Sequence, residues 1–166
     1  MRCFVLFGSP HKNGNTVRLL NDFLKKERIS EYDIVFAYDI SLSPCTDCGG
    51  CRKDGSCVKT DFNIVKSIYE KIVSADIFVL ASPVYFNSAP APLKCAIDRM
   101  QPFYIKKFVL GDRTKKKPRG VLILSGGEKE REGKREMLKE QFKYVFDVFG
   151  FEISEYIYAA GADAEE

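Results

Sequence analysis

The sequence predicts an open, doubly wound α/β sheet in which five parallel strands alternate with helices. Two observations support this prediction. Short apolar runs, most of them rich in β-branched or aromatic residues, recur along the chain, and apolar residues at helical spacing separate them. Parallel strands that are covered on both faces read as continuous apolar runs of this kind. With 166 residues, of which 45% are hydrophobic and 30% charged, the chain is expected to form a single globular domain over residues 1–166.

Four buried strands and one edge strand are expected. The buried strands share short, continuous apolar stretches, namely Cys3–Phe7, Ile34–Tyr38, Ile77–Ala81 and Val121–Leu124. The fifth segment, Glu152–Tyr158, alternates apolar and polar residues, which suits a strand at the edge of the sheet.

Four helices are expected between these strands. Their apolar residues repeat at helical spacing over residues 17–24, 64–73, 92–98 and 138–149. Asp61 is expected to cap the second helix, Pro92 suits the first turn of the third, and Gly150 stops the last one. The resulting order, βαβ-loop-αβαβαβ, predicts the flavodoxin-like strand order 2-1-3-4-5.

The loop after the second strand, residues 43–60, carries a compact cysteine array. Its four cysteines are spaced C-x2-C-x2-C-x5-C, at Cys45, Cys48, Cys51 and Cys57. Four clustered thiolates indicate a [4Fe–4S] cluster, and bacterial ferredoxins begin with a similar spacing. Tetrahedral zinc and an empty or disulfide-prone set of thiols are the alternatives. Because parallel strands end at one edge of the sheet, the cysteines and any ligand at that edge are expected to share one face of the molecule.

A second motif directly follows the first strand. Residues Gly8–Thr16 are rich in Gly, Ser, Asn and Thr and run into a helix. Backbone N–H groups, hydroxyls and a helix N-terminus together form a site for phosphate. The dinucleotide motif G-x-G-x-x-G and the nucleotide-triphosphate loop are both absent from this segment, and a plain tight turn is the alternative.

Two further loops are predicted to reach the same edge. One carries the aromatic pair Tyr85 and Phe86, and the other carries the glycine pair Gly126 and Gly127. An aromatic pair at this edge could flank a flat ring, with ordinary core packing as the alternative for the aromatics and a turn for the glycines.

Taken together, these segments resemble the NADPH-dependent FMN reductase family and, within it, the iron–sulfur flavoproteins. The resemblance covers roughly residues 2–127 and rests on Gly8–Thr16, Ser82–Asn87, Ala91–Lys94, Ile97–Arg99 and the cysteine array. One departure is Asn87, which stands where the family more often has glycine.

The resemblance implies the following site residues. The FMN phosphate would be held by Ser9, Lys12, Asn13, Asn15 and Thr16. The isoalloxazine ring would be lined by Pro83, Val84, Tyr85, Phe86 and Asn87, and closed by Ser125, Gly126 and Gly127. The [4Fe–4S] cluster would be bound by Cys45, Cys48, Cys51 and Cys57. No residue is expected to act in acid–base catalysis, because a flavin needs stacking and closeness more than a titrating side chain.

The resemblance implies an oxidoreductase that passes electrons from a ferredoxin-like donor through the cluster to FMN and on to a small acceptor. One alternative is a cluster-free FMN or quinone reductase that uses NAD(P)H. A second alternative is a carrier or regulatory module that binds flavin and is stabilised by zinc.

Charge and composition bound the partners and the compartment. No secretory signal or membrane-spanning stretch is seen, so a cytoplasmic protein is expected. The net charge is +3, but residues 105–119 carry +6, which fits a solvated loop or a docking patch for an acidic protein or a phosphorylated cofactor. No nucleic-acid or membrane partner is expected. The resemblance implies a homodimer or homotetramer, with an interface near Pro92 and loop 43–60.

Overall fold

One sheet of five parallel strands forms the centre of the computed structural model, which describes residues 1–111 and 118–162. The strand order is β2-β1-β3-β4-β5, which confirms the predicted flavodoxin-like topology. The strands are β1 (Cys3–Phe7), β2 (Asp33–Phe36), β3 (Ile77–Pro83), β4 (Arg119–Gly126) and β5 (Glu152–Ala160). All four strand pairs are parallel.

Three strand ends differ from the prediction in ways that bear on function. The second strand ends at Phe36 rather than at Tyr38, because Ala37–Asp39 turns away as a 3₁₀ helix. The third and fourth strands run further than expected, since Pro83 pairs with Ser125 at the end of the ladder. The loops that follow β3 and β4 are therefore anchored side by side.

The helices lie where the apolar spacing predicts them, with one short addition. They are α1 (Asn15–Lys26), α2 (Phe62–Ser74), α3 (Ala91–Asp98), α4 (Gln101–Tyr104) and α5 (Lys134–Phe149). Pro92 lies in the first turn of α3, and Gly150 ends α5 with a left-handed backbone (φ 77°), as expected. The helix α4, which continues into the π-helical segment Ile105–Val109, was not predicted.

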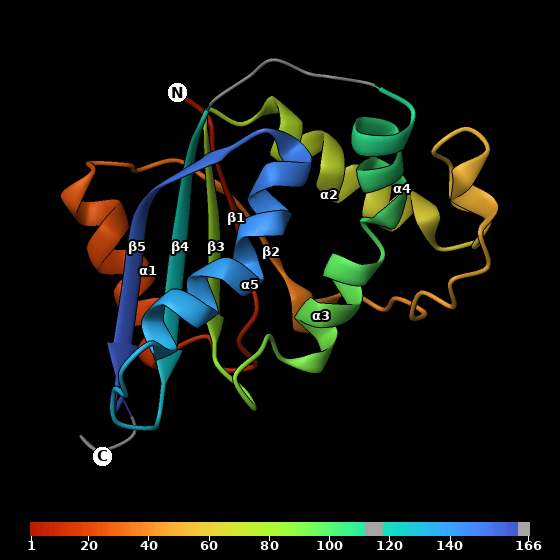
Figure 1. Cartoon of the computed structure of the whole chain (residues 1–166). Coiled ribbons are helices and arrows are strands. Elements are labelled where there is room, and N and C mark those ends of the chain that lie inside the picture. Colours follow the sequence, from red (N-terminus) through yellow and green to blue (C-terminus); the bar gives the residue numbers. More distant parts are fainter. Residues whose placement is uncertain (112–117, 163–166) are drawn as a thin grey trace.

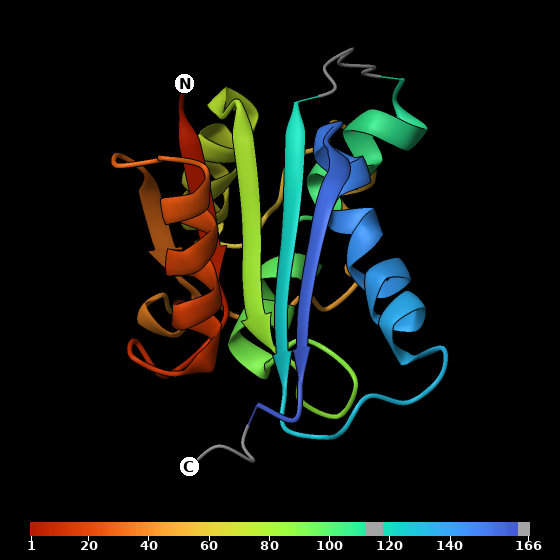
Figure 2. The ribbon, with the colours of Figure 1, turned by 90° about the vertical axis from the view of Figure 1, so that its left-hand side faces the viewer.

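Helices cover both faces of the sheet (Figures 1 and 2). Alternate residues of the strands point to opposite faces, as the pleat requires. Val5, Phe7 and Val79 pack with the apolar residues of α1 on one face. Phe4 and Phe78 belong to the larger core on the other face, together with residues of α2, α3, α4 and α5. The continuous apolar runs of β1, β3 and β4 are thus explained by burial on both sides.

Among the described residues, no helix is long and apolar enough to span a membrane.

Candidate functional site

Three predicted loops meet at Ser125, near the end of β4. The Ser125 hydroxyl shares a buried hydrogen bond of 2.8 Å with the hydroxyl of Thr16, at the start of α1. The Ser125 carbonyl accepts a bond of 2.8 Å from the backbone N–H of Val84, in the loop after β3. The sequence elements that the resemblance assigns to one flavin site are therefore brought together at the carboxyl edge of the sheet.

The loop after β1 leaves the N-terminus of α1 open. Gly14 occupies the N-cap position, and no side chain caps the helix. The first-turn N–H groups of a helix have no partner within the helix, so they are available to an anion. Ser9 is buried and accepts a bond of 3.1 Å from the N–H of His11, which holds the loop in its turn. The backbone of this loop fits a phosphate.

The polar side chains of this loop point to different partners. Lys12 is exposed and forms an ion pair of 2.5 Å with Asp39. Asn13 is exposed on the turn. Asn15 donates to the carbonyl of Ala162 at 2.7 Å, which ties the loop to the residue that follows β5. Thr16 is thus the predicted phosphate ligand that the structure places most firmly, and Lys12 would have to leave Asp39 to reach an anion.

The loop after β3 makes a tight turn at Phe86 and Asn87. Tyr85 and Ser88 exchange backbone hydrogen bonds, both of 2.9 Å. The two residues between them have left-handed backbones, with φ 49° at Phe86 and φ 57° at Asn87. Asparagine tolerates this conformation and glycine prefers it, which explains the difference from the family at position 87. For Phe86 it is strained, and the ring is fully exposed.

A pocket of about 460 Å³ lies between the loops after β3 and β4. Six of the predicted ring-lining residues border it or lie at its rim, namely Val84, Tyr85, Phe86, Asn87, Gly126 and Gly127. Its volume and its aromatic and glycine lining suit a flat ring.

Two charged residues of this pocket were missed by sequence reasoning. Glu128 and Lys134 line it and form an ion pair of 3.0 Å. The hydrogen bond from Lys134 lowers the pKa of Glu128. Lys134 is the first residue of α5 and is buried, although it sits in a charged stretch that reads as solvated surface.

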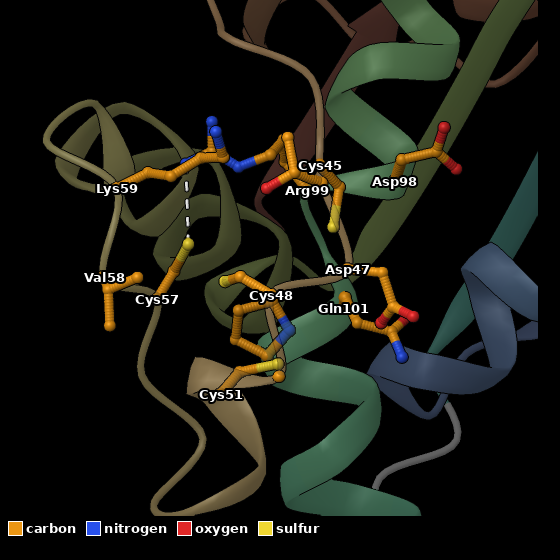
Figure 3. A pocket seen from close by; sticks show the side chains of 13 residues that line it. Cys45, Asp47, Cys48, Cys51, Cys57, Val58, Lys59, Asp98, Arg99 and Gln101 are labelled. Carbon is orange, nitrogen blue, oxygen red and sulfur yellow. Dashed lines mark hydrogen bonds between the residues drawn. The ribbon is translucent and has the colours of Figure 1, made fainter.

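The four cysteines of loop 43–60 line a second cavity (Figure 3). Cys45 and Cys48 are exposed, whereas Cys51 and Cys57 are partly buried. Gly49 and Gly55 have left-handed backbones (φ 72° and 73°), which lets the loop wrap tightly. Across the described residues, no three His, Cys, Asp or Glu side chains are close enough as they stand to hold a metal ion. The thiols converge on one space without closing a coordination shell.

A buried ionic cluster closes the base of this loop. Arg99 directly follows α3 and is 1% exposed, and its Nη2 lies 2.6 Å from Oδ1 of Asp61. Its Nη1 donates to the carbonyl of Ser43 at 2.7 Å. The other Asp61 oxygen accepts bonds from the N–H and the hydroxyl of Ser43, both of 2.7 Å. The two ends of the cysteine loop are therefore joined to each other and to the end of α3.

The role found for Asp61 corrects one prediction. Asp61 stands at the N-cap position of α2, but its side chain makes no capping hydrogen bond. Its carboxylate instead serves Arg99 and Ser43. The contact with the Arg99 guanidinium and the bonds from Ser43 hold the pKa of Asp61 well below its usual range. A charged partner for the buried cation takes precedence over the cap.

Arg99 also reaches the cysteines. Its Nη2 lies 3.7 Å from Sγ of Cys57, and the contact is drawn in Figure 3. Its buried Nε has no hydrogen-bond partner among the described residues. A buried donor without an acceptor is uncommon, and here it belongs to a residue that lines the thiol cavity. Four soft thiols beside a buried cation fit an anionic metal–thiolate group.

The two cavities do not share one face as expected. The cysteine loop leaves the carboxyl edge after β2 and runs beside α4, along the outside of the helical layer (Figure 1). The thiol cavity is completed by residues at the far end of α3 and at α4, namely Asp98, Arg99, Gln101 and Pro102. The flavin-type pocket borders the loop that precedes α3. The eight residues of α3 separate the two sites, because the pairing of Arg99 draws the loop toward that end.

The predicted cationic segment is only partly described. Arg113, Lys115, Lys116 and Lys117 lie outside the described residues. Arg119 pairs with Glu155 at 2.8 Å, and Lys107 donates to the carbonyl of Asp147. The side chain of Lys106 packs against Gly55 of the cysteine loop. These three cations serve contacts within the chain.

Comparison with known proteins links the chain to one family. The family model described as NADPH-dependent FMN reductase matches residues 1–164. The chain is 34% identical over 131 residues to a protein named iron-sulfur flavoprotein from Methanosarcina thermophila, covering 78% of this chain and 65% of that protein. It is 36% identical over 107 residues to an iron-sulfur flavoprotein of Methanocaldococcus jannaschii, covering 63% of this chain and 54% of the relative. The chain thus spans between about half and two thirds of these relatives.

Solved structures show the same fold at lower identity. A NAD(P)H:quinone oxidoreductase from Methanothermobacter marburgensis superposes with a TM-score of 0.73 at 19% identity, covering 100% of this chain and 87% of the other. An FMN-dependent NADH-azoreductase from Bacillus anthracis, in complex with FMN, superposes with a TM-score of 0.65 at 14% identity, covering 100% and 90%. At these identities the likeness concerns the fold alone.

The substitution Asp61→Asn should destabilise the metal-free protein by about 3 kcal/mol, because it leaves the buried Arg99 without a counter-charge. Urea unfolding at pH 7 measures this loss. Glu70→Gln, which alters an exposed pair on α2 with a separation of 3.9 Å, is the control and should change stability by less than about 0.5 kcal/mol. An equal effect of the two substitutions would contradict the role of Asp61.

Lowering the pH should also destabilise the folded protein, because protonation removes the charge of Asp61. The pKa of Asp61 is lower in the folded chain than its ordinary value of 3.8, so its contribution is complete above that pH and declines as the pH falls further. The pH profile of stability of Asp61→Asn should be flatter than that of the parent below about pH 4.

Proposed function

The chain belongs to the NADPH-dependent FMN reductase family, and on that premise we propose that it is a flavin-dependent oxidoreductase that carries both FMN and a [4Fe–4S] cluster. The observation that carries the proposal is the pair of cavities at opposite ends of α3. One is open, aromatic and next to a phosphate-type loop, and the other is lined by four thiols.

The FMN assignment rests on the carboxyl edge of the sheet. The open first turn of α1 and the hydroxyl of Thr16 would hold the phosphate, with Ser9, Lys12, Asn13 and Asn15 around it. Tyr85 and Phe86 would cover the ring, and Gly126 leaves room beside it, where a side chain would come within 3.0 Å of the Tyr158 hydroxyl. Pro83, Val84, Asn87, Ser125 and Gly127 complete the proposed set.

The cluster assignment rests on the donor set. Cys45, Cys48, Cys51 and Cys57 would supply four thiolates, and Arg99 would supply a buried positive charge beside them. The curated relatives named above are called iron-sulfur flavoproteins, which supports the same assignment. Because the thiols are not yet in a closed shell, the loop has to tighten around the metal when it is bound.

With both groups bound, the chain would hold a one-electron carrier, the cluster, and a carrier of one or two electrons, FMN. This pair would allow a ferredoxin-like donor to reduce a small acceptor, such as a quinone or another small organic compound. Two donor molecules would each give one electron, and the acceptor would take up both together with two protons from water. The residues of the chain contribute position: Tyr85 and Phe86 would flank one side of the ring, and the contacts of Arg99 with Asp61 and Ser43 hold the base of the cysteine loop. A cytoplasmic setting is part of the proposal, because clustered cysteines there bind metal more often than they form disulfides.

The open pocket supports a second candidate, and the four thiols support a third. A cluster-free reductase would take electrons from NAD(P)H at the open pocket of about 460 Å³ and pass them to FMN or a quinone. A zinc-stabilised flavin carrier would use the same cysteines for a structural metal.

Anaerobic purification decides between these functions. We expect about four iron and four sulfide ions and one FMN per chain. The variant Cys48→Ser should lose the iron and keep the FMN, because the two sites share no lining residue. Cys3→Ala, which removes a buried thiol of β1, is the matched control and should keep both groups. Zinc in place of iron, or FMN with no metal, would sink the proposal.

The substitution Thr16→Val should weaken FMN binding about tenfold or more, because a hydrogen bond to a charged phosphate is worth about 1.5–3 kcal/mol. Quenching of flavin fluorescence on titration of the FMN-free protein gives the dissociation constant. Thr16→Ser keeps the hydroxyl and should bind FMN nearly as tightly as the parent. If valine and serine bound FMN equally well, the phosphate would have to lie elsewhere.

A homodimer or homotetramer is part of the proposal. The fully exposed ring of Phe86 leaves the flavin pocket uncovered on one side, and a second copy would close it. Loop 43–60 and the start of α3 at Pro92 would lie in or near that interface. Sedimentation of the FMN-loaded protein should therefore show an oligomer, and a stable FMN-loaded monomer would be the contrary result.

A further inference from the structure

We propose that Arg99 is a positioning residue for the metal-binding cysteines and that its guanidinium raises the reduction potential of the cluster they hold. This inference rests on the proposed function, since it requires a cluster in the thiol cavity. It assigns a role to a residue that neither the phosphate loop nor the cysteine spacing points to.

The burial of Arg99 is the first observation. The side chain is 1% exposed, and arginine is rarely buried to this degree unless it is paired. The cavity is also lined by Lys59, Asp47 and Asp98, but these side chains are exposed or partly exposed. A charge at the surface is screened by water and salt more strongly than a buried one, although Asp61 offsets part of the charge of Arg99. Arg99 is therefore the lining cation with the strongest effect on the sulfur atoms.

The distribution of its donors is the second observation. Nη1 binds the carbonyl of Ser43, and Nη2 faces both Oδ1 of Asp61 and Sγ of Cys57. A residue that merely neutralised Asp61 would not need a nitrogen 3.7 Å from a ligand sulfur. The planar fork of arginine can serve these three partners at once, which the single ammonium group of lysine cannot.

The third observation is the buried Nε, which has no hydrogen-bond partner among the described residues. An N–H group in this position costs free energy unless an acceptor is supplied. Sulfur atoms of a metal–thiolate group in the cavity would supply acceptors. The guanidinium is thus better suited to a cavity that holds the anion formed by four thiolates and a metal core than to an empty cavity.

The effect on the potential follows from charge. Reduction adds one negative charge to the cluster, so a hydrogen-bond donor or a cation near the sulfur atoms stabilises the reduced form more than the oxidised form. Removing the guanidinium should lower the potential. We expect Arg99→Gln to shift the redox equilibrium of the cluster at least tenfold toward the oxidised form, which is 59 mV for a one-electron couple.

The test uses the anaerobically purified protein with its cofactors. The potential is measured by redox titration, with the electron paramagnetic resonance of the reduced cluster as the signal. The parent, Arg99→Gln, Arg99→Lys and the control Lys66→Gln are compared, the last of which removes an exposed cation of α2. The cluster of Lys66→Gln should have the same reduction potential as that of the parent. The potential of Arg99→Gln should be lower by at least the tenfold shift in equilibrium given above, and the potential of Arg99→Lys should lie between the two.

The contrary results are distinct. If the parent contains no iron, the proposed function fails and this inference fails with it. If the parent holds a cluster and Arg99→Gln titrates at the same potential, only the role of Arg99 is overturned. Should Arg99→Gln lose its cluster, Arg99→Lys decides, because it keeps the charge and loses the fork. A potential of Arg99→Lys equal to that of the parent then overturns the role of the guanidinium fork, because the positive charge alone would set the potential.

Discussion

One buried cation, Arg99, has to be paired, and this requirement determines the position of the cysteine loop, which is the part of this molecule that is not common to its fold. Arg99 is almost fully removed from water, and a buried guanidinium without partners would cost several kcal/mol. The chain meets that need with Asp61 and with the backbone of Ser43. Ser43 begins the cysteine loop, and Asp61 directly follows its last residue. The position of the loop over the end of α3, and hence that of its thiols, follows from the ionic contact at its base.

Helix α3 connects the two cavities in the sequence and in space. Its first turn follows the loop that borders the flavin-type pocket, and Arg99 follows its last turn. With eight residues it is about 12 Å long, since a helix rises about 1.5 Å per residue. Leu93 is fully buried, and its side chain lies against Gly8, where a Cβ atom would come within 2.5 Å. The absence of a side chain at Gly8 therefore lets α3 sit directly on the first strand.

The sheet and the flavin-type edge could be predicted from the sequence because both depend on local patterns. Continuous apolar runs indicate buried parallel strands, and a fixed strand order decides which loops meet at the carboxyl edge. The meeting of Thr16, Val84 and Ser125 follows from that rule.

The path of the cysteine loop could not be predicted in the same way. It depends on a contact between Arg99 and residues far away in the sequence, and nothing in the local pattern around Asp61 distinguishes it from a helix cap. Lys134 was missed for a similar reason, because its burial and its pairing with Glu128 depend on the folded chain and are not visible in the charged sequence around it.

The closed base of the cysteine loop has a consequence for changes within the loop. Because Ser43 and Asp61 are hydrogen-bonded to each other, the segment between them begins and ends at the same point of the fold. A segment of this kind can be inserted, exchanged or deleted while β2 and α2 keep their places. Changes in the length or sequence of loop 43–60 should therefore leave the flavin-type edge of the sheet in place, as long as Ser43, Asp61 and Arg99 keep their contacts.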